Sequence, residues 1–270
     1  MIKWSEAATE FVGFLASFLA TGSIGFRLAV LDRVIEERDF HRASAVRAAI
    51  IGLIGEAVTA AFYFSGGHLG TAQTLLVIAA LIGFILVLAR VGAGWWIAAI
   101  GVVFGQLSAL FAGKWTQLIN PVHRLAAGFW LGTLFVVVIA GLGPLLGSTL
   151  TTERRGAFAA AMINAFSPLA LGSAFVLVVF GVITAWRHLK YVSALWTTPY
   201  GYVLIVKLFF VFCVAALGAW NWRRQRPMLG TEPAAVAIRK SAAAELSVTL
   251  VVLIVTAILV SLPSPKLPPH

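Results

Sequence analysis

Charged residues are scarce in this chain of 270 residues. Only 11% of the residues are charged, whereas 60% are hydrophobic. Soluble domains have about 25% charged residues and roughly 45–50% apolar ones, so a soluble domain of this length would not cover so much apolar surface. The composition therefore excludes a cytosolic enzyme, a nucleic-acid-binding domain and a disordered chain, and it leaves a polytopic helical membrane protein.

Sulfur-containing residues are also few. Cysteine occurs once, as Cys213, and methionine three times. A single thiol excludes an internal disulfide framework and a metal site built from a cysteine cluster, and three methionines exclude a methionine-rich metal relay. Recognised catalytic motifs are absent as well, because there is no Walker loop, no HExxH and no paired carboxylate site. We therefore expect a protein that is not an enzyme.

The hydrophobic residues are grouped into long runs. A membrane-spanning helix needs about 20 apolar residues, and its backbone groups must be hydrogen-bonded within the segment. Alternation at a period of two, which would indicate a β-barrel, is not seen. The sequence thus predicts an all-α transmembrane helical bundle of about eight helices, at residues 7–29, 44–65, 71–90, 95–113, 122–147, 162–187, 199–222 and 245–262.

Basic residues are distributed unevenly between the loops, and this predicts the orientation. Of the lysines and arginines, 12 follow or end the odd-numbered runs and 6 lie on the opposite side. Since cytoplasmic loops carry the excess of positive charge, both termini are predicted to face outward, into the periplasm of a Gram-negative host. Much of the net charge of +10 is thereby assigned to loops, and no nucleic-acid partner is needed. Residues 223–244 are expected to form the longest loop, with at most a short interfacial helix.

Polar side chains inside the membrane are candidates for function because charge is costly there. Glu56 lies near the middle of the second run, and Lys207 lies about eight residues into the seventh. They are interpreted either as a buried ion pair or as parts of a proton or cation relay. Trp130 either packs or walls a site, and Ser167 lies where a proline is expected to bend the sixth helix. Gln106 is expected to form a hydrogen bond between helices.

Four of the five histidines fall on the predicted outer side. His68 lies in a glycine-rich turn, His123 opens the fifth helix and His188 closes the sixth. Neutral imidazole is the commonest metal ligand. His123 and His188 lie on adjacent helices at similar predicted depth, so the two rings are candidates to converge on one metal ion. The alternative for each histidine is a solvated side chain at the membrane surface.

Five short motifs in the second half, in order and at compatible spacing, resemble the copper-resistance D (CopD) family of bacterial inner-membrane proteins. They are H-x-x-A-A-x-x-W-x-G from His123 to Gly132, F-S-x-x-A from Phe166 to Ala170, T-x-Y-G-x-x-L-x-x-K from Thr198 to Lys207, Asn221 with Arg223, and Glu245 with the prolines after the last helix. The resemblance covers about residues 120–265. We therefore expect one integral membrane unit with two parts, an N-terminal four-helix part at residues 1–118 and a CopD-like four-helix part at residues 119–270.

The resemblance implies an inner-membrane protein that handles copper, either moving it across the membrane or supplying it to partners, among them a periplasmic copper-binding protein. It makes His123 the best candidate copper ligand, and it marks four further family-type positions: Trp130, Lys207, Asn221 and Glu245. The chain departs from the family at Lys114, where the family often carries a histidine, and a cation there repels copper.

Two other hypotheses remain open. A helical bundle with histidines on neighbouring helices can hold haem through axial imidazoles, which would make this a membrane redox protein. An assembly partner of another membrane complex, with no ligand of its own, would leave Glu56 and Lys207 as a packing pair. Cu(I) prefers thioether and thiolate ligands, so the scarcity of cysteine and methionine argues against a soft-ligand copper channel.

Overall fold

The computed structural model describes residues 3–34, 38–66, 70–111, 113–225, 228 and 230–265. All regular secondary structure within these residues is helical. Seven helices in the described part are long and apolar enough to cross a membrane, and a shorter apolar helix, α4 (Gly94–Gln106), occupies the fourth position. The protein is therefore an all-α, multi-pass membrane bundle, as the hydrophobic runs predict.

Six of the spans are built on single long α-helices. These are α1 (Trp4–Gly25), α2 (Arg38–Gly66), α3 (Thr71–Leu88), α8 (Thr152–Leu189), α10 (Pro199–Trp220) and α11 (Glu232–Ser261). The π-helical turn η1 (Phe26–Val30) and the 3₁₀ turn η2 (Leu31–Arg33) extend α1, and the π-helical turn η7 (Asn221–Gln225) extends α10. Short turns η3 (Ser108–Leu110) and α9 (Ala194–Thr197) lie in the connections.

The fifth span, Trp115–Leu146, is a single helix whose hydrogen-bonding pattern changes along its length. Its segments are η4 (Trp115–Leu118), α5 (Ile119–Ala127), η5 (Gly128–Gly132), α6 (Thr133–Val136), η6 (Val137–Leu142) and α7 (Gly143–Leu146). Both η5 and η6 are π-helical. Such turns are rare and often occur at functional sites, and η5 contains Trp130.

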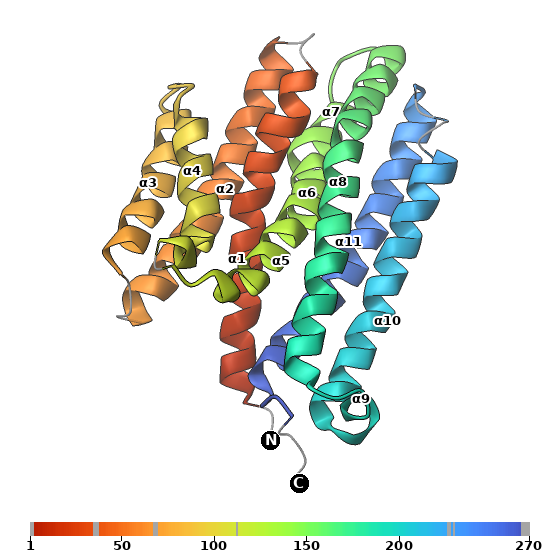
Figure 1. The fold of residues 1–270 in the computed structure, drawn as a ribbon. Coiled ribbons are helices and arrows are strands. Elements are labelled where there is room, and N and C mark those ends of the chain that lie inside the picture. The colour runs from red at the N-terminus through yellow and green to blue at the C-terminus, as the bar shows by residue number, and fades with distance from the viewer. Residues whose placement is uncertain are drawn as a thin grey trace, which may run out of the picture.

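α1 stands in the middle of the bundle, and α2, η5, α6 and α11 pack around it. The pair α3 and α4 lies on one flank, and α10 lies on the other, against α11 (Figure 1). α1 begins and α11 ends at the same end of the bundle, the lower end in Figure 1, which we call the outer end. The basic loops that are predicted to be cytoplasmic lie at the opposite, inner end.

Small residues allow α1 and the fifth span to touch through their backbones. A Cβ atom added at Gly22 would overlap the backbone of Gly132, and one added at Gly132 would overlap the carbonyl oxygen of Phe18. Close helix approach of this kind is how small residues stabilise membrane bundles, since lipid is as apolar as the side chains. The contact fixes the position of Trp130 along the bundle axis relative to α1.

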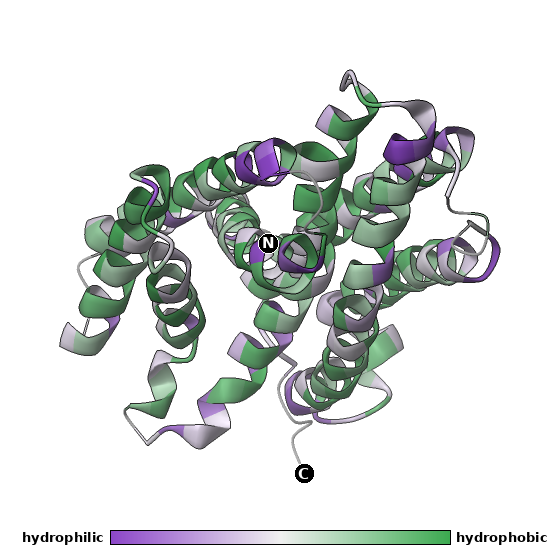
Figure 2. Cartoon of the chain, turned by 90° about the horizontal axis from the view of Figure 1, so that it is seen from above, coloured by the Kyte–Doolittle hydropathy of each residue, from purple (hydrophilic) through white to green (hydrophobic). Residues whose placement is uncertain are grey.

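Large apolar side chains cover the outside of the bundle. Leu75 on α3, Phe175 on α8 and Phe212 on α10 are all exposed. Viewed along the bundle, hydrophobic residues run along the helices, and hydrophilic ones gather at helix ends and in the connections (Figure 2). This surface is suited to contact with lipid tails, as in a protein embedded in the bilayer.

The inner end differs from the sequence-based expectation, because residues 232–244 are not a loop. α11 begins at Glu232 and runs without a break into the span. The hydroxyl of Thr231 caps it by accepting a hydrogen bond from the amide of Ala234, and Glu232 pairs with Arg155 over 2.8 Å. Hydropathy marks only the part of a helix that lies in hydrocarbon, whereas a capped, alanine-rich helix continues through the interface.

Trp95 lies near the start of a predicted span, a position at which tryptophans typically gather at the membrane surface. It is instead buried, with Phe84 against its ring and the guanidinium of Arg27 over it. Arg27 also pairs with Asp32. Pro168 lies inside α8, which is continuous from Thr152 to Leu189, and the bend at this proline stays a prediction.

Candidate functional site

His123 lies in the outer part of α5 and faces α8. Its Nδ1 atom is 3.1 Å from the carbonyl oxygen of Leu177, and a Cβ atom added at Gly181 would lie only 3.0 Å from its Cε1 atom. A carbonyl oxygen only accepts hydrogen bonds, so this contact assigns the proton to Nδ1. Nε2 then keeps its lone pair, which is the arrangement of histidines that bind metal through the other nitrogen.

Lys207 is half-buried on α10, and its positive charge is close enough to act electrostatically on the imidazole of His123. Among the residues described, Lys207 has no ion-pair partner. A cation held by Nε2 of His123 would therefore be repelled by Lys207. Metal capture here is favoured only when an anionic ligand accompanies the metal.

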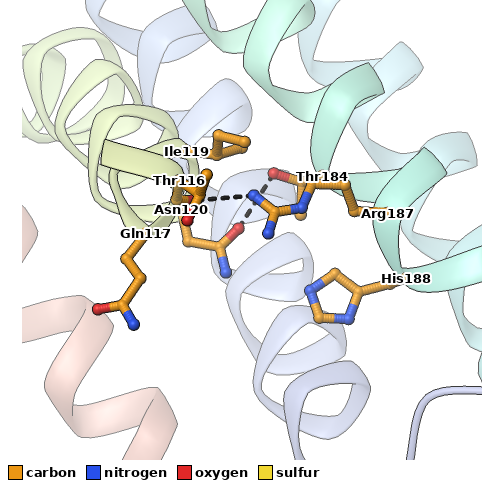
Figure 3. Close-up of a pocket in the computed structure, with 7 residues that line it drawn as sticks. All are labelled: Thr116, Gln117, Ile119, Asn120, Thr184, Arg187 and His188. Carbon is orange, nitrogen blue, oxygen red and sulfur yellow. Dashed lines mark hydrogen bonds between the residues drawn. The ribbon is translucent and has the colours of Figure 1, made fainter. Parts of the chain in front are cut away.

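A cavity of about 320 Å³ opens at the outer end, where the fifth span begins and α8 ends. It is lined by Thr116, Gln117, Ile119, Asn120, Thr184, Arg187 and His188 (Figure 3). Thr184 donates a hydrogen bond of 3.1 Å to Oδ1 of Asn120, and Arg187 donates one of 2.7 Å to the carbonyl oxygen of Thr116. His123 does not line the cavity but lies one helical turn further in than Asn120.

The expected convergence of His123 and His188 is not seen. His123 meets α8 between Leu177 and Gly181, whereas His188 lies a further seven residues along α8. At the rise of an α-helix, this is roughly 10 Å. His188 has its own partners, since its Nδ1 atom is 2.9 Å from the hydroxyl of Ser264 and its ring stacks on Tyr200. The third histidine, His68, lies outside the described residues.

A second polar group lies deeper, where α10 and α11 meet the fifth span. The side-chain amide of Asn221 donates a hydrogen bond of 3.3 Å to Glu245, which is buried, and its oxygen accepts one from Ser241. A Cβ atom added at Gly218 would lie 3.5 Å from the carboxylate of Glu245 and 3.7 Å from the ring of Trp130. Three of the family-type positions, from three different helices, thus surround Gly218.

Glu56 and Lys207 form no ion pair in the described structure. Glu56 is buried on α2, which packs against α1 and α3, whereas α10 packs against α11 on the other flank. Of the two interpretations, the buried ion pair is thus not seen, because depth along a span does not tell which helices are neighbours. The relay stays a prediction. Ser167 is also buried, and its hydroxyl donates to the carbonyl oxygen of Ile163 on its own helix.

A polar network between α1, α4 and α5 was only partly predicted. Oε1 of Gln106 accepts hydrogen bonds from Ser17 over 3.0 Å and from Arg124 over 3.2 Å, and its Nε2 atom donates to Thr21 over 3.0 Å. The interhelical role of Gln106 is confirmed. Arg124, counted with the outer loops, turns out to be part of the network. The spacing of Ser17 and Thr21, four residues apart on one helix face, is the signal that would have indicated them.

No group of three or more histidine, cysteine, aspartate or glutamate side chains in the described part of the chain is arranged to hold a metal ion. Cys213 is a free thiol on α10. Among the described residues, His123 therefore stands apart from any such group of potential metal ligands.

The second half of the chain matches a known family. Residues 160–259 match the model of the copper resistance protein D (CopD) family. This region includes Lys207, Asn221 and Glu245 but not His123. The copper transport protein CutJ of Bacillus subtilis (strain 168) is 28% identical over 184 residues, which are 65% of this chain and 32% of that relative. The chain thus spans about a third of that relative's length. No solved structure matches the chain significantly.

Proposed function

Because the chain carries a region of the copper-resistance D family at residues 160–259, we propose that it is a multi-pass protein of the bacterial inner membrane that takes up copper at its outer end. Copper binds there to Nε2 of His123, either for transport across the membrane or for copper tolerance. The relative CutJ is named a copper transport protein, which supports copper as the ion that is handled.

The hydrogen bond between Nδ1 of His123 and the carbonyl oxygen of Leu177 is the observation that carries the proposal. It orients the ring and leaves Nε2 as a ligand. Burial of the ring between α5 and α8 also keeps it from turning freely, so the ligand atom is held in place before the metal arrives.

The remaining copper ligands come from a partner in this proposal. A single imidazole does not saturate copper, and the positive charge of Lys207 acts against a bare cation at His123. A periplasmic copper-binding protein that brings its own anionic ligands would meet both requirements. From His123 inward, the next carboxylate in the second half of the bundle is that of Glu245, beside Trp130 and Asn221.

Copper titration of the purified protein tests the site. In lipid nanodiscs, with copper supplied as a complex with a small anionic ligand that stands in for the partner, the wild type is expected to bind about one copper per chain by elemental analysis, and His123→Ala is expected to lose that copper. His188→Ala is the matched control, since it also removes an outer imidazole, and it is expected to keep copper. Equal copper in wild type and His123→Ala would overturn the assignment of this ligand.

An absorption spectrum of the same sample separates the alternatives. A Soret band would favour the haem-binding redox protein. A colourless, copper-free protein that co-purifies with another membrane protein in fixed ratio would favour the assembly partner. In cells, copper content that is unchanged by deletion of the gene and by His123→Ala would contradict copper handling altogether.

A further inference from the structure

We propose that the outer cavity binds an oxyanion, namely the phosphate group of a phospholipid or a free phosphate. The cavity is the one between the start of the fifth span and the end of α8, lined by Asn120, Arg187 and their neighbours (Figure 3). Its chemistry differs from that of a copper site, and the proposal does not depend on the function of His123.

Hydrogen-bond donors dominate the lining. Asn120 uses its oxygen to accept from Thr184, which leaves its NH₂ group for a ligand. One guanidinium nitrogen of Arg187 donates a hydrogen bond to the carbonyl oxygen of Thr116. The other N–H groups of the guanidinium have no partner among the described residues. Gln117 adds a second side-chain amide.

The charge of the cavity also fits an anion. None of the seven lining residues is acidic, and one of them is an arginine. The guanidinium group recognises phosphate and carboxylate through two parallel hydrogen bonds. Thr116 and Gln117 lie in the first turn of the fifth span, and the N-terminus of a helix favours negative charge. The positive charge of Arg187 would repel a bare metal cation here.

The position of the cavity corresponds to the level of lipid headgroups. Trp115 and Trp186 are 68% and 65% exposed, and they directly precede the lining residues Thr116 and Arg187. Exposed tryptophans gather at the membrane–water interface. A volume of about 320 Å³ is at the lower end of the range of ligand pockets, roughly 300–1,000 Å³, so it suits a headgroup phosphate rather than a large solute.

Asn120→Asp is the sharpest variant. It keeps the oxygen that accepts from Thr184, and so it preserves the local fold, but it replaces the NH₂ donors by negative charge. Inorganic phosphate titrated into purified protein, followed by calorimetry and by tryptophan fluorescence, is expected to bind the wild type. Asn120→Asp is expected to weaken this binding tenfold or more, about the effect of losing one charge-assisted hydrogen bond. Equal affinity in both proteins would overturn the proposal.

Arg187→Gln tests whether the positive charge of Arg187 contributes to phosphate binding, and Lys190→Gln is its matched control. Lys190 lies three residues beyond Arg187 and is exposed, but it does not line the cavity. We expect Arg187→Gln to weaken phosphate binding at least tenfold and Lys190→Gln to change it less than twofold, at equal ionic strength. An equal loss in both would indicate general surface charge and would contradict a built site.

Lipid retention distinguishes the two sources of phosphate. Nanodiscs of phosphatidylcholine doped with phosphatidylglycerol, followed by native mass spectrometry, would show one retained phosphatidylglycerol in the wild type and none in Asn120→Asp if the ligand is a headgroup. Phosphate binding without lipid retention would assign a soluble phosphate. Absence of both would overturn the proposal, while leaving copper binding by His123 untouched.

Discussion

The side-chain amide of Asn221, at the end of α10, donates a hydrogen bond of 3.3 Å to the buried carboxylate of Glu245 on α11. Ser241 donates to the oxygen of the same amide. Buried polar groups are costly unless they are hydrogen-bonded, so these three side chains stabilise the α10–α11 pair only as a set.

Removal of Glu245 is therefore expected to destabilise the protein. Glu245→Ala leaves the amide of Asn221 without an acceptor and should cost about 1–3 kcal/mol, whereas Glu245→Gln keeps an acceptor oxygen and should cost less. Thermal unfolding in detergent measures both, with the exposed Glu10→Ala as control. An unchanged Tm for Glu245→Ala would show that the set contributes nothing to stability.

Glycine positions give a second prediction. A Cβ atom at Gly132 would overlap the carbonyl oxygen of Phe18, so Gly132→Ala must push α1 away from η5 and should cost about 1–3 kcal/mol. Gly218→Ala meets its neighbours at ordinary contact distance and should be tolerated. Gly13→Ala, which meets no atom within 4 Å, is the control and should be neutral or slightly stabilising. Equal Tm values for all three would contradict the backbone contact.

The network around Gln106 predicts coupling between α1 and α4. Ser17→Ala and Gln106→Leu each remove the 3.0 Å hydrogen bond between these side chains. Combined in a double-mutant cycle, they should show an interaction energy of about 0.5–1.5 kcal/mol. Strictly additive losses in unfolding free energy would show that the two helices pack without help from this bond.

Lys207 should tune the affinity of His123 for copper. Lys207→Met removes a positive charge that acts on the imidazole, so copper is expected to bind roughly tenfold more tightly. Arg223→Met, at the far end of the same span, is the control and should leave the affinity unchanged. Weaker copper binding in Lys207→Met would instead assign the amine a direct part in holding the metal or its anionic ligand.

The orientation in the membrane can be measured with single cysteines. In a Cys213→Ser background, Ser5→Cys places a thiol at the outer end and Thr152→Cys places one at the inner end. A membrane-impermeant maleimide added to intact spheroplasts is expected to label position 5 and to reach position 152 only after permeabilisation. The reverse pattern would invert the bundle relative to the distribution of basic residues.

Sequence predicts the spans well because hydrophobicity follows directly from contact with lipid. The same logic fails at helix ends, as at Glu232, where a cap and an ion pair to Arg155 extend α11 beyond the apolar run. It also fails for Trp95, because an aromatic residue near a span end looks the same whether it faces headgroups or Phe84.

The candidate site, too, could be predicted from the sequence only in part. The motif positions indicated that Trp130, Asn221 and Glu245 matter, but their meeting around Gly218 depends on how three helices pack. Glu56 and Lys207 looked equally suited to pair, yet they lie on opposite flanks of α1. One-dimensional spacing gives depth in the membrane, and the choice of neighbouring helices is decided by contacts such as that between Gly22 and Gly132.

The contact of Gly22 with Gly132 also sets an order for biogenesis. α1 leaves the ribosome before the fifth span, and its backbone partner follows about 110 residues later. At typical synthesis rates this is a wait on the order of ten seconds. During that time Thr21, which is fully buried beside Gly128 in the finished bundle, faces lipid or the insertion machinery. Assembly of this protein is thus a delayed closure, in which one face of α1 stays without its partner until the fifth span is inserted.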